Sequence, residues 1–188
     1  MRNKDDGKSK SIEGAVKDKG HVSPNWDFKY DLIDGVKMKD VRNIVTKNGI
    51  TRELYRPDWT TAEGKKVVDG TVQHMIFVSL RGHAISAWHM HEIQTDHIYP
   101  INGLGKLVLF DGRDGSKTRG KVNAFNVSPM RPTLFVIPPG VWHGLQNMDT
   151  PEFQFINFFD RPYEYDKPDE WRLPFNTDKI PYKFERQF

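Results

Sequence analysis

The chain has 188 residues, of which 37% are hydrophobic and 12% aromatic, and its formal net charge is +3. This length suits one domain with a single core. The absence of cysteine excludes disulfides and thiolate metal ligands, and it fits the cytoplasmic location that we expect. Lys and Arg are interleaved with Asp and Glu, which argues against a nucleic-acid-binding groove, while the slight positive excess suits an anionic small-molecule substrate.

Membrane association is not expected either. No apolar run approaches the roughly 20 residues that a membrane-spanning helix needs. The first residues are charged and polar, without the hydrophobic stretch of a secretory signal.

The predicted elements are strands, with looser segments at both ends. Residues 1–28 are rich in Lys, Asp, Gly and Ser, and we expect them to form a flexible N-terminal arm. Asn48-Gly49 stands between two runs rich in β-branched residues, which is typical of a tight hairpin. Further strands are predicted at residues 71–80, 84–91, 96–101, 106–110, 121–127, 133–137 and 152–159.

The end of the chain has a different character from these strands. Residues 161–188 are punctuated by proline, which predicts an irregular C-terminal tail that packs on the strands. Short strands separated by Gly and Pro turns favour an all-β barrel or sandwich.

Two groups of polar residues carry the chemistry. The first reads His89-x-His91-x4-Asp96-x6-Gly103, and the second, about 45 residues later, contains His143 behind a Pro-Pro-Gly turn. Because side chains alternate along a strand, His89 and His91 project to the same face. Imidazoles and a carboxylate are ligands that divalent transition metals prefer.

These two groups resemble the sequence motifs of the cupin superfamily, which are small jelly-roll β-barrels. The resemblance implies a cupin β-barrel over residues 29–160 with His89, His91, Asp96 and His143 as metal ligands. It implies one divalent ion per chain, of iron, manganese, zinc or nickel. His97 competes with Asp96 as a ligand, although it faces the other side of a regular strand. Surface histidines and a barrel without metal remain the alternatives.

One family among the RmlC-like cupins matches further. The stretch Asp111-x-Arg113-x-x-Ser116-x-Thr118-x-Gly120 resembles a segment of the dTDP-4-dehydrorhamnose 3,5-epimerases, and so does the run Ile137–Gly144. Val72-Gln73-His74 resembles the start of their core strand, and residues 165–170 resemble their tail. The resemblance spans roughly residues 37 to 184.

That family is metal-free and uses a His base, a Tyr acid and a Lys that polarises the sugar ketone. By resemblance the base falls on His89 and the Lys position falls on Asp96. Tyr163 and Tyr165 lie a few residues late for the acid, and we expect no counterpart of the Asp that pairs with the His. A His whose lone pair binds a metal cannot also accept a proton from the substrate. With Asp96 at the Lys position as well, the scaffold resembles the epimerases while the centre resembles a metal cupin.

Three functions follow as hypotheses. The first is a metal-dependent epimerase or isomerase that acts on a carbonyl-bearing nucleotide sugar or a related molecule. The second is an iron dioxygenase, and the third is a cupin that binds a small ligand without catalysis. A homodimer is expected by resemblance only. The candidate acid and base residues are Glu53, Tyr99, His74, Tyr165 and Glu92; each also has a purely structural interpretation, such as an ion pair for Glu53 and packing for Tyr99.

Overall fold

The computed structural model describes residues 30–185, and the predicted arm at 1–28 lies outside them. The chain divides into two units, Met1–Asp31 and Leu32–Phe188, and the second contains every strand described below. The strands are β1 (Lys37–Asp40), β2 (Ile44–Thr46), β3 (Gly49–Thr51), β4 (His74–Leu80), β5 (Ile85–Met90), β6 (Asp96–Asn102), β7 (Gly105–Asp111), β8 (Val122–Val127), β9 (Thr133–Ile137), β10 (Val141–Asn147), β11 (Phe153–Phe159) and β12 (Trp171–Arg172).

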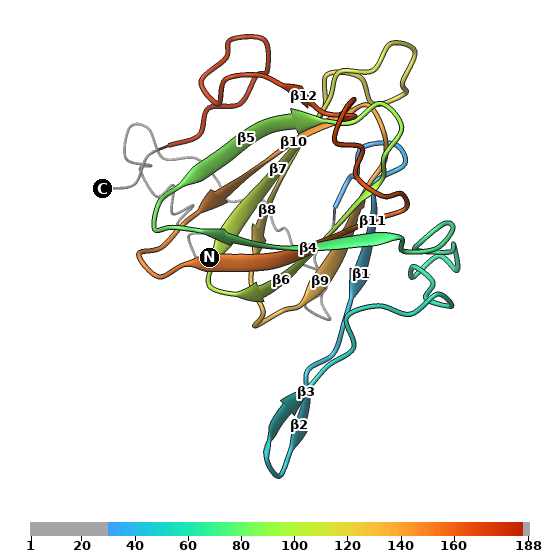
Figure 1. Ribbon diagram of the computed structural model, residues 1–188, viewed down its shortest axis with the longest axis vertical. Coiled ribbons are helices and arrows are strands. Elements are labelled where there is room, and N and C mark those ends of the chain that lie inside the picture. Colours follow the sequence, from blue (N-terminus) through green and yellow to red (C-terminus); the bar gives the residue numbers. More distant parts are fainter. Residues whose placement is uncertain (1–29, 186–188) are drawn as a thin grey trace, which may run out of the picture. The chain divides into compact units, whose positions relative to one another are not determined.

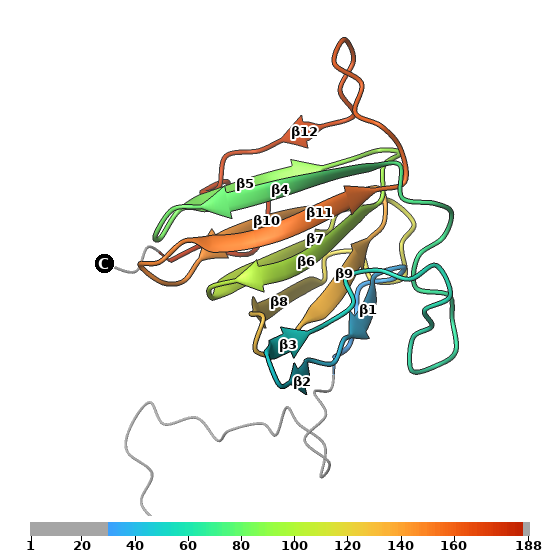
Figure 2. The same ribbon diagram turned by 60° about the horizontal axis from the view of Figure 1, so that its bottom comes forward.

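Two five-stranded sheets face each other in the second unit (Figures 1 and 2). One has the order β1-β9-β6-β11-β4 and the other the order β12-β5-β10-β7-β8. Neighbouring strands are antiparallel, and strands that follow one another in the chain often belong to opposite sheets. This all-β jelly-roll arrangement confirms the predicted fold class, although the sheets form a sandwich and do not close into a barrel.

The core lies between the sheets because inward-facing residues of both are apolar. Ile98 and Phe135 from the first sheet meet Leu107, Leu109 and Phe125 from the second. Alternation along each strand sends the intervening residues outward.

The outer face of each five-stranded sheet is covered by another segment of the chain. Residues of the 55–72 segment pack over the first sheet against buried Tyr99 and Phe158. The C-terminal tail covers the second sheet, where Ile180 and Phe184 pack on Trp88. The tail also adds β12 to the edge of β5, so the sandwich includes residues beyond 160.

The predicted strands correspond to β4 to β9 and β11, and the hairpin at Asn48-Gly49 is confirmed as β2 and β3. Three strands were not predicted, namely β1, β10 and β12. In residues 30–185 no helix has the length and apolarity to cross a bilayer.

Candidate active site

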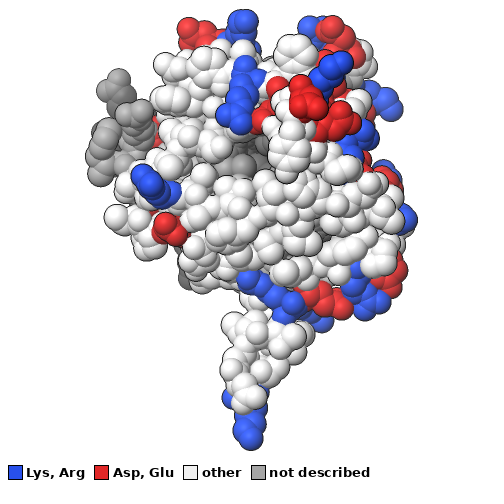
Figure 3. Space-filling model, in the orientation of Figure 1, with Lys and Arg blue, Asp and Glu red and all other residues white. Residues whose placement is uncertain are grey.

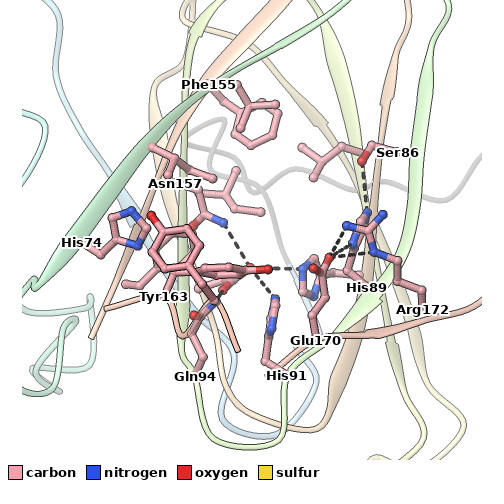
Figure 4. Close-up of a pocket in the computed structure, with 18 residues that line it drawn as sticks. His74, Ser86, His89, His91, Gln94, Phe155, Asn157, Tyr163, Glu170 and Arg172 are labelled. Atoms are coloured by element: carbon pink, nitrogen blue, oxygen red, sulfur yellow. Dashed lines mark hydrogen bonds and ion pairs between the residues drawn. The ribbon is translucent and has the colours of Figure 1, made fainter. Parts of the chain in front are cut away.

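A cavity of about 490 Å³ opens between the sheets beside the core (Figures 3 and 4). Strands of both sheets and the chain after β11 contribute its walls. Its lining includes His74, Ser86, His89, His91, Gln94, Asp96, Ile98, His143, Phe155, Asn157, Tyr163, Tyr165, Glu170 and Arg172. In Figure 4, His89 and Glu170 lie on one side of it, and His74 and Tyr163 lie on the other.

His89 is held by a carboxylate from the tail. Pairing of β12 with β5 places Arg172 opposite His89 and brings Glu170 beside it. The His89 Nδ1 atom lies 2.8 Å from Glu170 Oε1, and its Nε2 atom lies 3.1 Å from Ser86 Oγ. Arg172 donates to the same Glu170 oxygen from Nε at 3.0 Å.

The pKa values of this pair favour a neutral His89 and an ionised Glu170. Burial lowers the pKa of His89, and the hydrogen bond to Glu170 only partly offsets that effect. Burial would raise the pKa of Glu170, but hydrogen bonding to His89 and the charge of Arg172 outweigh it and lower the pKa. A neutral imidazole oriented by a carboxylate is a competent general base.

His91, Asp96 and His143 form a second group. Their ligand atoms all lie within 4.8 Å of one another. Asp96 Oδ2 is 3.1 Å from His143 Nε2 and 3.5 Å from His91 Nε2. His89 is not a member of this group, so the structure brings together three of the four residues that the cupin resemblance implied.

Asp96 is buried and fully hydrogen-bonded. Gln94 Nε2 donates to its Oδ1 at 2.7 Å, and Asn157 Nδ2 donates to its Oδ2 at 3.1 Å. Burial opposes the charge of Asp96, but contacts with His143 and His91 outweigh burial and hold its pKa well below the usual value. Burial likewise opposes the charge of His91, yet the Asp96 carboxylate raises the pKa of His91 to about 9.

Strand β10 brings His143 into this site. His143 lies opposite His89 across the β10–β5 pair, and the register shifts between His143 and Leu145. Gly144 occupies that shift, where a Cβ atom would lie only 2.5 Å from the Ala87 Cβ. The close approach of the two strands therefore depends on glycine at 144.

Asp169 fixes the turn that follows β5. Its carboxylate accepts the backbone N–H groups of Glu92, Ile93 and Gln94 at 2.8–2.9 Å. Its backbone carbonyl accepts the Nδ1–H of His91. The tail thus orients both His89 and His91.

Several predicted residues lie elsewhere. Tyr99 is fully buried on the outer face of β6, where its hydroxyl donates to the Glu53 carbonyl, and Glu53 itself pairs with Arg56. Neither residue lines the cavity, so neither is placed to act as the acid or the base. Glu92 is exposed in the turn that Asp169 holds, and it does not line the cavity either.

His97 also faces away from the site. Its ring stacks on Phe158, and its Nδ1–H donates to the Phe158 carbonyl at 2.8 Å. It belongs to the outer face of the first sheet and does not compete with Asp96. By contrast, His74 and Tyr165 do line the cavity, together with Tyr163.

Sequence reasoning missed the tail residues Asp169 and Glu170. The expectation that His89 would lack an acidic partner was wrong, because Glu170 takes that place. The available signals were the two adjacent acids before an aromatic residue and the resemblance of residues 165–170 to the tail of the epimerase family.

The family model described as dTDP-4-dehydrorhamnose 3,5-epimerase matches residues 31–185. The chain belongs to this family. It is thus a sugar-epimerase-like enzyme, as the resemblance implied.

Two curated relatives extend over most of the chain. It is 31% identical to the spore coat polysaccharide biosynthesis protein SpsL of Bacillus subtilis (strain 168) over 84% of this chain and 99% of that protein. It is 28% identical to the probable low-salt glycan biosynthesis epimerase Agl13 of Haloferax volcanii over 77% of this chain and 89% of that protein.

Solved structures share the fold. A dTDP sugar isomerase from Desulfovibrio desulfuricans G20 superposes with a TM-score of 0.71 at 23% identity, covering 80% of this chain and 91% of that one. A dTDP-4-dehydrorhamnose 3,5-epimerase from Bacillus anthracis gives a TM-score of 0.71 at 18% identity, covering 82% and 87% respectively.

Proposed function

We propose that this enzyme epimerises the keto-sugar part of a nucleotide-linked sugar, by moving a proton on a carbon next to the carbonyl. The observation that carries the proposal is the His89–Glu170 pair on one wall of a cavity whose opposite wall holds Tyr163. Membership in the epimerase family supports the same reaction class.

His89 acts as the base. Its Nδ1–H donates to Glu170, so the Nε2 lone pair is free to take a proton once substrate displaces the contact with Ser86. As the C–H bond breaks, its electron pair passes into the enolate and the proton goes to Nε2. The Glu170 carboxylate then stabilises the imidazolium.

Tyr163 acts as the acid. A tyrosine on the cavity wall opposite His89 can return a proton to the same carbon from the other face, which inverts the stereocentre. The phenolate then regains a proton from solvent, and His89 releases its proton. Tyr165 also lines the cavity, but it is 86% exposed and less suited to this step.

The developing enolate requires a positive or hydrogen-bond-donating group beside the carbonyl oxygen. Among the described residues that line the cavity, Arg172 is the single Lys or Arg, and it is bound to Glu170. The group formed by His91, Asp96 and His143 is therefore the best-placed source of that stabilisation.

Proton exchange tests the proposal. We expect the enzyme to incorporate deuterium from D₂O into dTDP-4-dehydrorhamnose beside its carbonyl, as followed by NMR. His89→Gln should abolish the exchange, while Glu164→Gln, which alters an acid outside the cavity lining, should retain it. Absence of exchange with any nucleotide-linked keto sugar would contradict the proposal.

The same assay separates the other hypotheses. A dioxygenase would consume oxygen, which an oxygen electrode detects, and a protein that only binds its ligand would do neither. We further propose that the enzyme is a cytoplasmic homodimer, which cell fractionation and light scattering would test.

A further inference from the structure

We propose that His91, Asp96 and His143 bind one divalent first-row transition metal ion, and that His89 stays outside this site as the base. Metal binding stands on the geometry of the three residues alone. Its use in catalysis rests on the proposed epimerase function.

The ring tautomers of the two histidines determine which nitrogen of each ring can bind a metal. A carbonyl oxygen can only accept, so His91 Nδ1 must donate to the Asp169 carbonyl and His143 Nδ1 must donate to the Val141 carbonyl. In their neutral forms both rings therefore present a lone pair at Nε2. Each of these lone pairs points at Asp96 Oδ2, an atom that also only accepts when ionised.

Acceptors that converge in this way are held together by a positive species, which is either a proton on a ring nitrogen or a metal ion in its place. Metal-binding histidines characteristically donate their second ring nitrogen to a carbonyl or carboxylate, as both rings do here. Zinc binds nitrogen and oxygen ligands at about 2.0–2.2 Å, which places tetrahedral donors about 3.3–3.6 Å apart. The separations from Asp96 Oδ2, 3.1 Å to His143 Nε2 and 3.5 Å to His91 Nε2, lie close to that range.

The surroundings of Asp96 match the same role. Gln94 donates to Oδ1 and Asn157 donates to Oδ2, and these hydrogen bonds fix the orientation of the carboxylate. Such supporting hydrogen bonds orient metal-binding carboxylates. Three protein ligands at the wall of an open cavity leave a coordination position for substrate, as in catalytic metal sites.

His89 lies outside the group of ligand atoms that approach one another within 4.8 Å, and its two ring nitrogens face other partners. Nδ1 meets Glu170 and Nε2 meets Ser86. The base and the metal site are thus separate neighbours, which removes the conflict between accepting a proton and binding a metal. When bound, the ion would supply Lewis-acid polarisation of a carbonyl oxygen.

The test is metal binding by the purified, untagged enzyme. After chelator treatment, we expect isothermal titration with zinc and then manganese ions to show one ion per chain. His91→Ala and Asp96→Asn should lose this binding. His89→Ala is the matched control from the same cavity and should keep it; circular dichroism confirms that each variant is folded.

The outcomes separate the two proposals. If the native enzyme binds neither zinc nor manganese ions, or if His89→Ala also loses binding, the metal site is overturned. The proton-exchange assay then decides the epimerase function independently. One bound ion without any exchange would overturn the epimerase function and leave the metal site intact. Exchange that continues unchanged in chelated enzyme would remove the ion from catalysis.

Discussion

Asp169 and Glu170 are adjacent in the chain, yet they hold two different histidines of the cavity. The Asp169 carbonyl accepts from His91, and the Glu170 carboxylate contacts His89 at 2.8 Å. One dipeptide therefore sets the orientation of both the proposed base and a member of the proposed metal site.

Replacing Glu170 should impair proton transfer. We expect Glu170→Gln to lower kcat by about a hundredfold with a much smaller change in KM, because the amide cannot stabilise the imidazolium of His89. Steady-state kinetics would measure this. Glu164→Gln, an acid from the same stretch, is the control, and equal losses in both variants would argue against the pair.

The two tyrosines of the cavity should differ. We expect Tyr163→Phe to lower kcat by about a hundredfold and Tyr165→Phe to change it little, because a mostly exposed hydroxyl gives a poorly positioned acid. Deuterium exchange without inversion in Tyr163→Phe would be a second signature. A larger loss in Tyr165→Phe would reverse the assignment.

Asp111 should contribute stability rather than activity. It is buried and accepts hydrogen bonds from Arg113, Ser116 and Thr118. Burial would raise its pKa, but these contacts outweigh it and lower the pKa, so the contribution is present above the unfolded pKa of about 4 and is lost as the pH falls below it.

We expect Asp111→Asn to cost about 3 kcal/mol near pH 7, since breaking a buried pair leaves a charge without its partner. Urea unfolding between about pH 3 and pH 7 would show the difference from wild type shrinking towards acid, where carboxyl groups become protonated. Asp114→Asn, whose side chain is exposed, is the control. An undiminished difference at acid pH would contradict this account.

The proposed homodimer can be tested at β4, which is an edge strand of the first sheet. Met75 and Phe77 are more than half exposed there, and Figure 3 shows few charges on the face that carries this strand. Exposed apolar patches and unpaired strand edges favour association. We expect light scattering to report a dimer and the double change Met75→Asp, Phe77→Asp to shift it towards monomer.

Met130→Asp serves as the control for that experiment, since Met130 is exposed on a turn away from β4. A native enzyme that is monomeric at all concentrations would exclude the dimer. An effect of Met130→Asp as large as that of the double change would exclude β4 as its contact.

Alternation along strands made much of this molecule predictable. The spacing of His89 and His91 and the Asp96 position correctly indicated residues that line one cavity. His97 and Tyr99 are two residues apart on β6 and face the same side of the sheet, away from the site. The sequence alone could therefore have ruled out Tyr99 as an acid or base. Strand β10 escaped prediction because the Pro-Pro-Gly turn before it and Gly144 within it are both typical of loops.

The contacts of the tail could not be predicted in the same way. Glu170 lies 81 residues from His89 along the chain, and only the pairing of the two-residue strand β12 with β5 brings them together. So short a strand has almost no periodicity to detect. The proposed separation of roles between His89 and the other two histidines depends on that contact, which the sequence motif alone does not contain.

The brevity of β12 has a consequence for the working enzyme. A two-residue strand at a sheet edge contributes few backbone hydrogen bonds, so we expect it to open more readily than the central strands. Release of this strand would free His89 and His91 from their partners while the sandwich stays folded. Mild denaturant should therefore abolish activity reversibly before the sheets unfold, because the tail detaches from the site while the rest of the structure stays intact.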